Sequence, residues 1–139
     1  TLAVREESAG MAASRVSALP DVRQALLQLQ HNFRQLPGLV ADGRDMGTVI
    51  FPDAPLKIFL TASAHCRAER RHRQLIARGE KAILADLLRS LELRDEQDKT
   101  RQSAPLKPAE DALQLDNSAQ TIEDSVDTVL NWWQDRRPF

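Results

Sequence analysis

The sequence predicts an α/β protein in which helices cover a small parallel sheet. Three short apolar runs, each suited to a buried strand, lie at residues 39–42, 56–61 and 112–116. Segments with helical patterns surround them, in the order helix, helix, strand, strand, helix, helix, strand, helix. Strands alternating with helices are typical of parallel sheets, because parallel strands need a long crossover connection that a helix usually provides.

Two helices are expected before the first strand. Residues 5–18 are rich in Ala and Glu, with acidic residues near the start. Pro20 and Asp21 open a second helix over 20–36, which the Pro-Gly pair at 37–38 ends. Apolar residues recur in this second helix at three- and four-residue spacing and predict one apolar stripe. The stripe residues are Val22, Leu26, Leu29 and Phe33.

Further helices are expected after the second strand. Ser63 is placed to cap a basic helix over 64–78, which Gly79 ends. Another helix is expected over 81–98, followed by a connection rich in turn-forming residues. The third strand then leads into a closing helix that reaches about residue 136 and is capped near Thr121.

Composition excludes several classes of function. The net charge of −1 does not favour binding to nucleic acid or to an acidic membrane surface. No apolar stretch approaches the ~18–20 residues of a transmembrane helix. Cys66 is the single cysteine, which excludes an intramolecular disulfide and fits a reducing compartment. We therefore expect a soluble, cytoplasmic protein without nucleic-acid or membrane partners.

Charged residues gather directly after the first predicted strand, beside glycines that would let a ligand approach the backbone. Asp42 ends this strand, a position from which P-loop phosphotransferases present a carboxylate to nucleotide-bound Mg²⁺. Arg44 can bind a phosphate through two hydrogen bonds, and the Asp45 carboxylate can accept hydrogen bonds from an amino group. A turn cap for Asp42 and an exposed salt bridge between Arg44 and Asp45 remain open as alternatives.

A second cluster lies in the segment LRDEQDKTR, residues 93–101. Arg94, Asp98 and Arg101 are spaced so that they share one face of a helix. Two cations flanking an anion suit a ribose phosphate, with arginines on the phosphate and the carboxylate on hydroxyl groups. The alternative is a solvated helix face with ion pairs between neighbouring turns.

Arginines crowd the helix over 64–78. Arginines on a mobile lid are one way in which kinases neutralise a transferring phosphoryl group. A solvated helix face is the ordinary alternative, and an RNA-binding helix is weakened by the lack of nearby aromatic residues. The histidines show no metal-ligand spacing, so a zinc site is not expected.

Taken in order, these segments resemble the bacterial cytidylate kinases, a family of P-loop nucleoside monophosphate kinases. The stretch ADGRDMGTVIFPDAPLKIFLTAS at 41–63 carries most of the resemblance. RAERR at 67–71, RDEQDKTRQSAPLKPAEDALQLDNS at 94–118 and IEDSVDTVL at 122–130 support it. The resemblance extends over about residues 4–129 and implies phosphoryl transfer from ATP to CMP or dCMP, with Mg²⁺.

The resemblance implies base contacts from three residues, Ser14, Arg23 and Asp45. These residue types suit cytosine, whose exocyclic amine donates to a carboxylate while its ring nitrogen and O2 accept from Arg and Ser. Uracil would turn a carbonyl toward Asp45 and leave a polar contact unpaired.

The resemblance assigns the other site residues as well. Arg44 and Arg101 match the arginines that hold the monophosphate, and Arg94 and Asp98 match the pair that faces the sugar hydroxyls. Asp42 matches the strand-end acid near Mg²⁺. The lid that closes over the ATP phosphates is matched by Arg67, Arg70 and Arg71.

One feature of the family is missing from this sequence. The family begins with a strand and a glycine-rich P-loop, but none of the five glycines here begins a GxxxxGK[ST] pattern. We therefore expect the C-terminal portion of a cytidylate kinase. Its parts would be CMP-binding helices at 5–36, core strands and a loop at 38–61, a lid helix at 64–79, and further helices and a strand at 81–136.

The implied fold is a P-loop nucleoside monophosphate kinase-like parallel sheet that lacks its first, central strand. That strand would lie between those at 39–42 and 56–61, and its absence leaves two unpaired edges. We expect that the edges pair with each other, that the chain exchanges elements with a second copy and self-associates, or that the chain is the remnant of a longer protein. The intact enzyme would be a monomer. The fragment would neither hold ATP and Mg²⁺ tightly nor turn over. A non-catalytic nucleotide- or RNA-binding module and a kinase with another acceptor are the rival interpretations.

Overall fold

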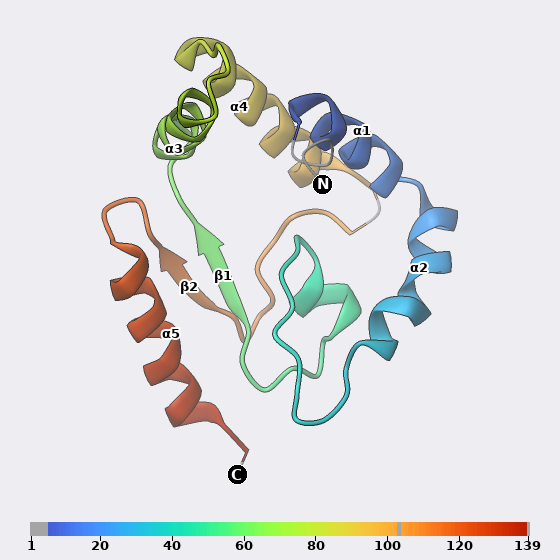
Figure 1. Ribbon diagram of the computed structural model, residues 1–139. Helices are drawn as coiled ribbons and strands as arrows, with labels where there is room; N and C mark the ends of the chain where they lie inside the picture. The colour runs from blue at the N-terminus through green and yellow to red at the C-terminus, as the bar shows by residue number, and fades with distance from the viewer. Residues whose placement is uncertain (1–5, 103, 139) are drawn as a thin grey trace.

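The computed structural model describes residues 6–102 and 104–138, so residue 5, where the first helix was expected to begin, lies outside it. Figure 1 shows an open arrangement in which α1 and α2 follow one another along one side and the strands lie on the other. The elements in chain order are α1 (Glu7–Ser17), α2 (Pro20–Asn32), the π-helical turn η2 (Met46–Ile50), β1 (Ile58–Thr61), α3 (Ala64–Ala77), α4 (Leu84–Thr100), β2 (Leu113–Asp116) and α5 (Ile122–Arg136).

The strands β1 and β2 form a parallel pair, which confirms the predicted α/β class with a parallel sheet. Ile58 is opposite Leu113, and Thr61 is opposite Asp116. Two backbone hydrogen bonds flank the pair, from Leu113 N to the Lys57 carbonyl and from Asn117 N to the Thr61 carbonyl, each 2.9 Å long. Within the described residues the sheet has these two strands alone.

The helices α3 and α4 form the crossover between β1 and β2 (Figure 1). They also contain the main hydrophobic core. Ala68 and Leu75 of α3 are buried against Leu87 of α4. Partly buried apolar residues of the second helix and its approach surround them, namely Ala82, Leu84, Leu88 and Leu91. This helix pair is the best-packed part of the described chain.

The predicted helix ends are confirmed where a local signal defines them. Ser63 Oγ accepts a hydrogen bond from Cys66 N at 3.1 Å and caps α3. Gly79, with φ of +76°, ends the same helix in a conformation that disfavours side chains with a Cβ. Thr121 and Asp124 form a reciprocal capping box at the start of α5.

The prediction of a strand over 39–42 is wrong. These residues adopt no regular structure and are exposed, with Val40 99% accessible. No backbone hydrogen bond links them to residues 56–60, all of which the structure describes, so the two predicted strands do not pair directly. A strand persists only where its backbone groups find partners, and within the described ranges this apolar run has no neighbouring strand.

Other element bounds differ less from the prediction. The second helix ends at Asn32 rather than near residue 36, and α4 begins at Leu84 rather than 81. The apolar stripe of α2 is largely uncovered, since Leu29 and Phe33 are more than half exposed. No helix in the described part of the chain has the length and apolar character needed to cross a bilayer.

Candidate functional site

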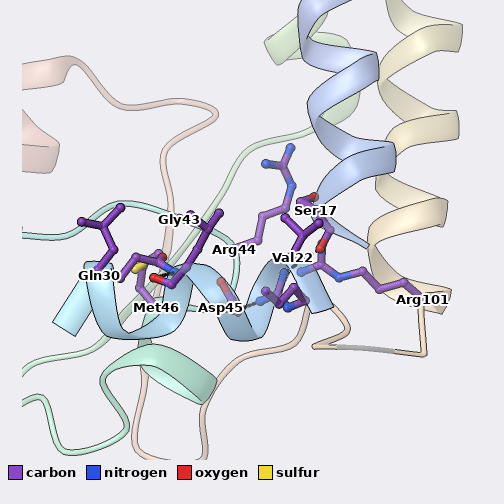
Figure 2. Close-up of a pocket in the computed structure, with 11 residues that line it drawn as sticks. Ser17, Val22, Gln30, Gly43, Arg44, Asp45, Met46 and Arg101 are labelled. Carbon is purple, nitrogen blue, oxygen red and sulfur yellow. Dashed lines mark hydrogen bonds and ion pairs between the residues drawn. The ribbon is translucent and has the colours of Figure 1, made fainter. Parts of the chain in front are cut away.

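A pocket of about 420 Å³ lies between α2, the loop leading into η2 and the end of α4 (Figure 2). Its volume is within the range of small-molecule sites. The lining residues are Ser17, Val22, Arg23, Leu26, Leu29, Gln30, Gly43, Arg44, Asp45, Met46 and Arg101. The pocket therefore brings Arg44 and Asp45 of the first charged cluster together with Arg101 of the second, which lies far along the sequence.

Asp45 and Arg23 form an ion pair in this pocket, between Oδ2 of the carboxylate and Nη2 of the guanidinium. Asp45 is only 7% exposed and directly precedes η2, whereas Arg23 is on α2. Arg23 Nη1 also donates to the Ser17 carbonyl at 2.9 Å. Burial, and then the charge of Arg101, lower the pKa of Arg23, which remains a cation at neutral pH.

The Asp98 carboxylate lies between the guanidinium groups of Arg44 and Arg101. This carboxylate is 3% exposed; its Oδ2 pairs with Arg44 Nε and its Oδ1 lies 3.8 Å from Arg101 Nη1. The Arg101 side chain is itself 9% exposed, and its Nε donates to the Ala104 carbonyl at 2.5 Å. Its Nη2 is buried without a hydrogen-bond partner in the described structure. Such a donor is costly unless a ligand supplies an acceptor.

The charge of this group favours an anion. Three guanidinium groups, of Arg23, Arg44 and Arg101, face two carboxylates, of Asp45 and Asp98, which leaves one positive charge in excess. Arginine binds phosphate and carboxylate groups through paired hydrogen bonds. The pocket can therefore hold a small anionic molecule, with a carboxylate available to accept hydrogen bonds from its polar groups.

Besides the lid arginines, four predicted site residues lie outside the pocket lining: Asp98, described above, and Ser14, Arg94 and Asp42. Ser14 is half-buried on α1, and its carbonyl accepts a hydrogen bond from Ser17 Oγ at 3.1 Å. Arg94 on α4 lies against α1, where a Cβ at Gly10 would be 3.3 Å from its Nη1. Asp42 is exposed on the irregular segment and ends no strand, which corrects its predicted placement.

The predicted lid arginines make contacts away from the pocket. Arg67 donates two hydrogen bonds to the Asp95 carboxylate, which raises the pKa of Arg67. Arg70 donates to Asn117, at 3.0 Å to Oδ1 and 2.6 Å to the carbonyl. Arg71 lies on the same helix. These contacts join α3 to α4 and to the end of β2, and none of the three residues is among those that line the pocket.

Sequence reasoning missed several pocket residues. Ser17 and Gln30 belong to no motif, and Ser17 contributes through its backbone carbonyl. Met46 lies in the stretch 41–63, but nothing in its residue type pointed to a role in the pocket. The apolar stripe of α2 gave the only available signal, since Leu26 and Leu29 line the pocket rather than a core. An apolar stripe on α2 that the other described helices and strands leave largely uncovered was the clue that could have identified Leu26 and Leu29 as pocket residues.

The family model for cytidylate kinases matches residues 1–135. The chain belongs to the cytidylate kinase family. A cytidylate kinase of Cupriavidus necator is 59% identical over 138 residues, and one of Stutzerimonas stutzeri is 60% identical over 136. These alignments cover 99% and 98% of this chain but 62% and 59% of the relatives. The chain thus spans about three-fifths of the length of the curated cytidylate kinases it matches.

The described residues form no site that fits the ATP and Mg²⁺ that the family implies. No group of three or more His, Cys, Asp or Glu side chains within the described ranges could hold a metal ion. Asp42 is exposed, and the sequence has no GxxxxGK[ST] pattern that could hold the phosphates of ATP. No chemical step is therefore assigned to a metal or to ATP in this chain.

Proposed function

We propose that this chain carries the acceptor site of a cytidylate kinase and binds CMP or dCMP. The whole protein would transfer the γ-phosphoryl group of ATP to this acceptor, giving ADP and CDP or dCDP. The observation that carries the proposal is the pocket in which the Arg23–Asp45 pair lies beside the buried, partly unpaired guanidinium of Arg101.

Recognition of cytosine is the role we propose for the Arg23–Asp45 pair. A guanidinium beside a carboxylate offers a donor next to an acceptor. Cytosine presents the matching edge, because its exocyclic amine donates and its ring nitrogen accepts. Uracil presents the reverse pattern, so binding it would leave buried polar groups unpaired. In keeping with the resemblance, Ser14 on the preceding helix would assist in holding the base.

Binding of the monophosphate is the role we propose for Arg44 and Arg101. A phosphate oxygen would supply the acceptor that Arg101 Nη2 lacks, and the dianion would offset the excess positive charge of the pocket. Asp98 would hold both guanidinium groups in place and, with Arg94, would face the sugar hydroxyls. The acceptor would thus lie across the pocket from the Asp45 end to the Arg101 end.

The proposal also includes the arrangement of strands in the sheet of the whole protein. We propose a P-loop nucleoside monophosphate kinase-like sheet whose central strand lies between residues 39–42 and β1. The exposure of Leu39 and Val40, and the confinement of the sheet to two strands within the described residues, support this. In the whole enzyme, Arg67, Arg70 and Arg71 would act from the lid and Asp42 would lie near Mg²⁺.

Isothermal titration calorimetry with CMP, dCMP and UMP tests the acceptor site. We expect CMP to bind more tightly than UMP, and Asp45→Asn to reduce this preference by about tenfold or more, because the amide no longer offers two acceptor oxygens. Asp127→Asn is a matched control, since Asp127 is an exposed carboxylate on α5 that does not line the pocket. Equal affinities for CMP and UMP in the unmodified chain would contradict the proposal.

A coupled assay of ADP release addresses catalysis by the chain itself. Because the sequence lacks a phosphate-binding loop, we expect no CMP-dependent turnover at the ~1–100 s⁻¹ typical of kinases. Turnover in that range would show that other residues take the place of the loop.

A further inference from the structure

A hydrogen bond between α2 and η2 lies just beyond the pocket. His31 Nε2, near the end of α2, is 2.8 Å from the Ile50 carbonyl at the end of η2. A carbonyl oxygen can only accept, so Nε2 carries the proton and donates it. Ile50 is buried, which shields the bond from competing water.

This contact reaches Asp45 through one turn of backbone. The amides of Val49 and Ile50 donate to the Asp45 carbonyl, at 2.9 and 3.2 Å. The peptide groups on either side of Ile50 therefore connect the imidazole of His31 to the backbone of Asp45. Because the Asp45 carboxylate also pairs with Arg23, α2 holds this turn at both of its ends.

The surroundings of His31 fix its ring. The imidazole lies at a tilt of 50° against the Phe51 ring, with 5.7 Å between centroids. The Arg34 guanidinium covers the same Phe51 ring at 5.4 Å and donates to both carboxylate oxygens of Asp53 at 2.8 Å. These contacts tie the residues after η2 to the end of α2, so His31 has little freedom to leave the Ile50 carbonyl.

We propose that His31 is a positioning residue for base recognition. By holding the Ile50 carbonyl, it fixes the η2 turn so that the Asp45 carboxylate stays beside Arg23, in the arrangement that distinguishes cytosine from uracil. This inference rests on the proposed CMP site. A polar contact gives strong discrimination only when its groups are held in place, and a loop supplies that rigidity only when other residues anchor it.

The test compares CMP and UMP binding by calorimetry in His31→Ala and His31→Gln. We expect His31→Ala to lower the ratio of CMP to UMP affinity by about three- to tenfold, the effect of one lost hydrogen bond. His31→Gln should keep the ratio within about twofold, because its amide nitrogen can donate to the same carbonyl. His65→Ala is the control, since His65 is exposed on α3 and pairs with Glu69.

An unchanged ratio of CMP to UMP affinity in His31→Ala would overturn the proposal. If the variant weakens both affinities equally and also lowers the unfolding temperature, His31 has a purely structural role.

A second measurement separates this inference from the proposed function. If the unmodified chain shows no preference for CMP, the acceptor proposal fails, and hydrogen exchange at the amides of Val49 and Ile50 then tests the anchoring itself. Faster exchange in His31→Ala, but not in His31→Gln or His65→Ala, supports the anchoring role. Equal exchange in all variants rejects it.

Discussion

At the scale of single residues, two hydrogen bonds between one pair of charged side chains hold the crossover helices α3 and α4 together. Arg67 of α3 donates to both oxygens of Asp95 on α4, through Nη1 at 2.9 Å and through Nη2. The paired geometry orients both side chains, and about a third of each is exposed. Paired guanidinium–carboxylate contacts of this kind stabilise more than single exposed ion pairs do.

We expect a double-mutant cycle on Arg67→Ala and Asp95→Ala to give a coupling free energy of about 1 kcal/mol. The hydrogen bonds disappear with either partner, so the double variant should lose less stability than the sum of the single variants. Urea denaturation measures the free energy of unfolding of all four proteins. Arg73→Ala is the control, because Arg73 lies on the same helix and is exposed.

A coupling near zero would show that water replaces this contact without cost. In that case α3 and α4 would be joined by the apolar core alone, and Arg67 would be available to act from a lid at little energetic expense.

The sequence was informative about the charged pocket residues and uninformative about their neighbours. Arg44, Asp45 and Arg101 could be singled out because charged residues beside glycines, or on one helix face, favour ligand binding. Ser17 could not, because it acts through a backbone carbonyl that every residue possesses. His31 could not either, since its partner is the carbonyl of a residue far along the chain.

At the scale of secondary-structure elements, capping contacts within a few residues determine where α5 begins. Thr121 Oγ1 accepts from Asp124 N at 3.0 Å, and the Asp124 carboxylate accepts from Thr121 N at 3.2 Å and from its hydroxyl at 2.7 Å. The hydrogen bond from the Thr121 hydroxyl is the main cause that lowers the pKa of Asp124, and the hydrogen bond from the Thr121 backbone amide lowers it further. The carboxylate is therefore favoured over the protonated acid in the folded state.

This pKa shift predicts a pH dependence of stability. A carboxyl whose pKa is lowered by folding stabilises the protein fully above its unfolded pKa of about 4, and the contribution is lost as pH falls through the folded value. We expect the stability difference between the unmodified chain and Thr121→Ala to shrink between about pH 5 and pH 2. Chemical denaturation at several pH values measures it.

Thr128→Ala serves as the control for this prediction. Thr128 lies in the same helix and donates only to the Asp124 carbonyl, so its effect on stability should not follow the titration of the carboxyl. A Thr121→Ala effect that is constant with pH would show that the Asp124 side chain takes no part in capping.

Elements defined by local signals were predicted well, and the element that depends on a distant partner was not. Ser63, Gly79 and Thr121 define helix ends through contacts within a few residues, so the sequence reveals them. The run at 39–42 has the composition of a buried strand, but no strand lies beside it among the residues that the structure describes. Composition reports what a segment could bury, whereas pairing depends on the rest of the sheet.

The whole molecule exposes more surface than a compact chain of its mass. Its accessible surface is 10,175 Å², whereas a compact monomer of 15.6 kDa exposes about 7,300 Å². Large apolar side chains are part of this surface: Leu36 and Val40 are almost fully accessible, and Phe33 and Leu60 are more than half exposed. Apolar surface of this kind promotes association in water.

We therefore expect two or more copies of this chain to associate through the exposed apolar residues at 36–40. Sedimentation velocity over a range of concentrations should show oligomers, and Val40→Asp should shift the distribution toward monomer, because a buried charge would be unpaired in the interface. Ile122→Asp is the comparison, since Ile122 is an exposed apolar residue on α5. A monomer at every concentration would contradict the expectation, and a response to Ile122→Asp alone would move the interface to α5.

The parallel pairing of β1 with β2 also has a consequence for the order in which this chain folds. The two strands are separated by the whole of α3 and α4, so an unstructured chain would lose much loop entropy in bringing Leu60 opposite Leu115. The contacts between α3 and α4 are close in sequence and include the main hydrophobic core. We expect this helix pair to form first and to shorten the path between the strands. The sheet would then assemble on a folded helical hairpin.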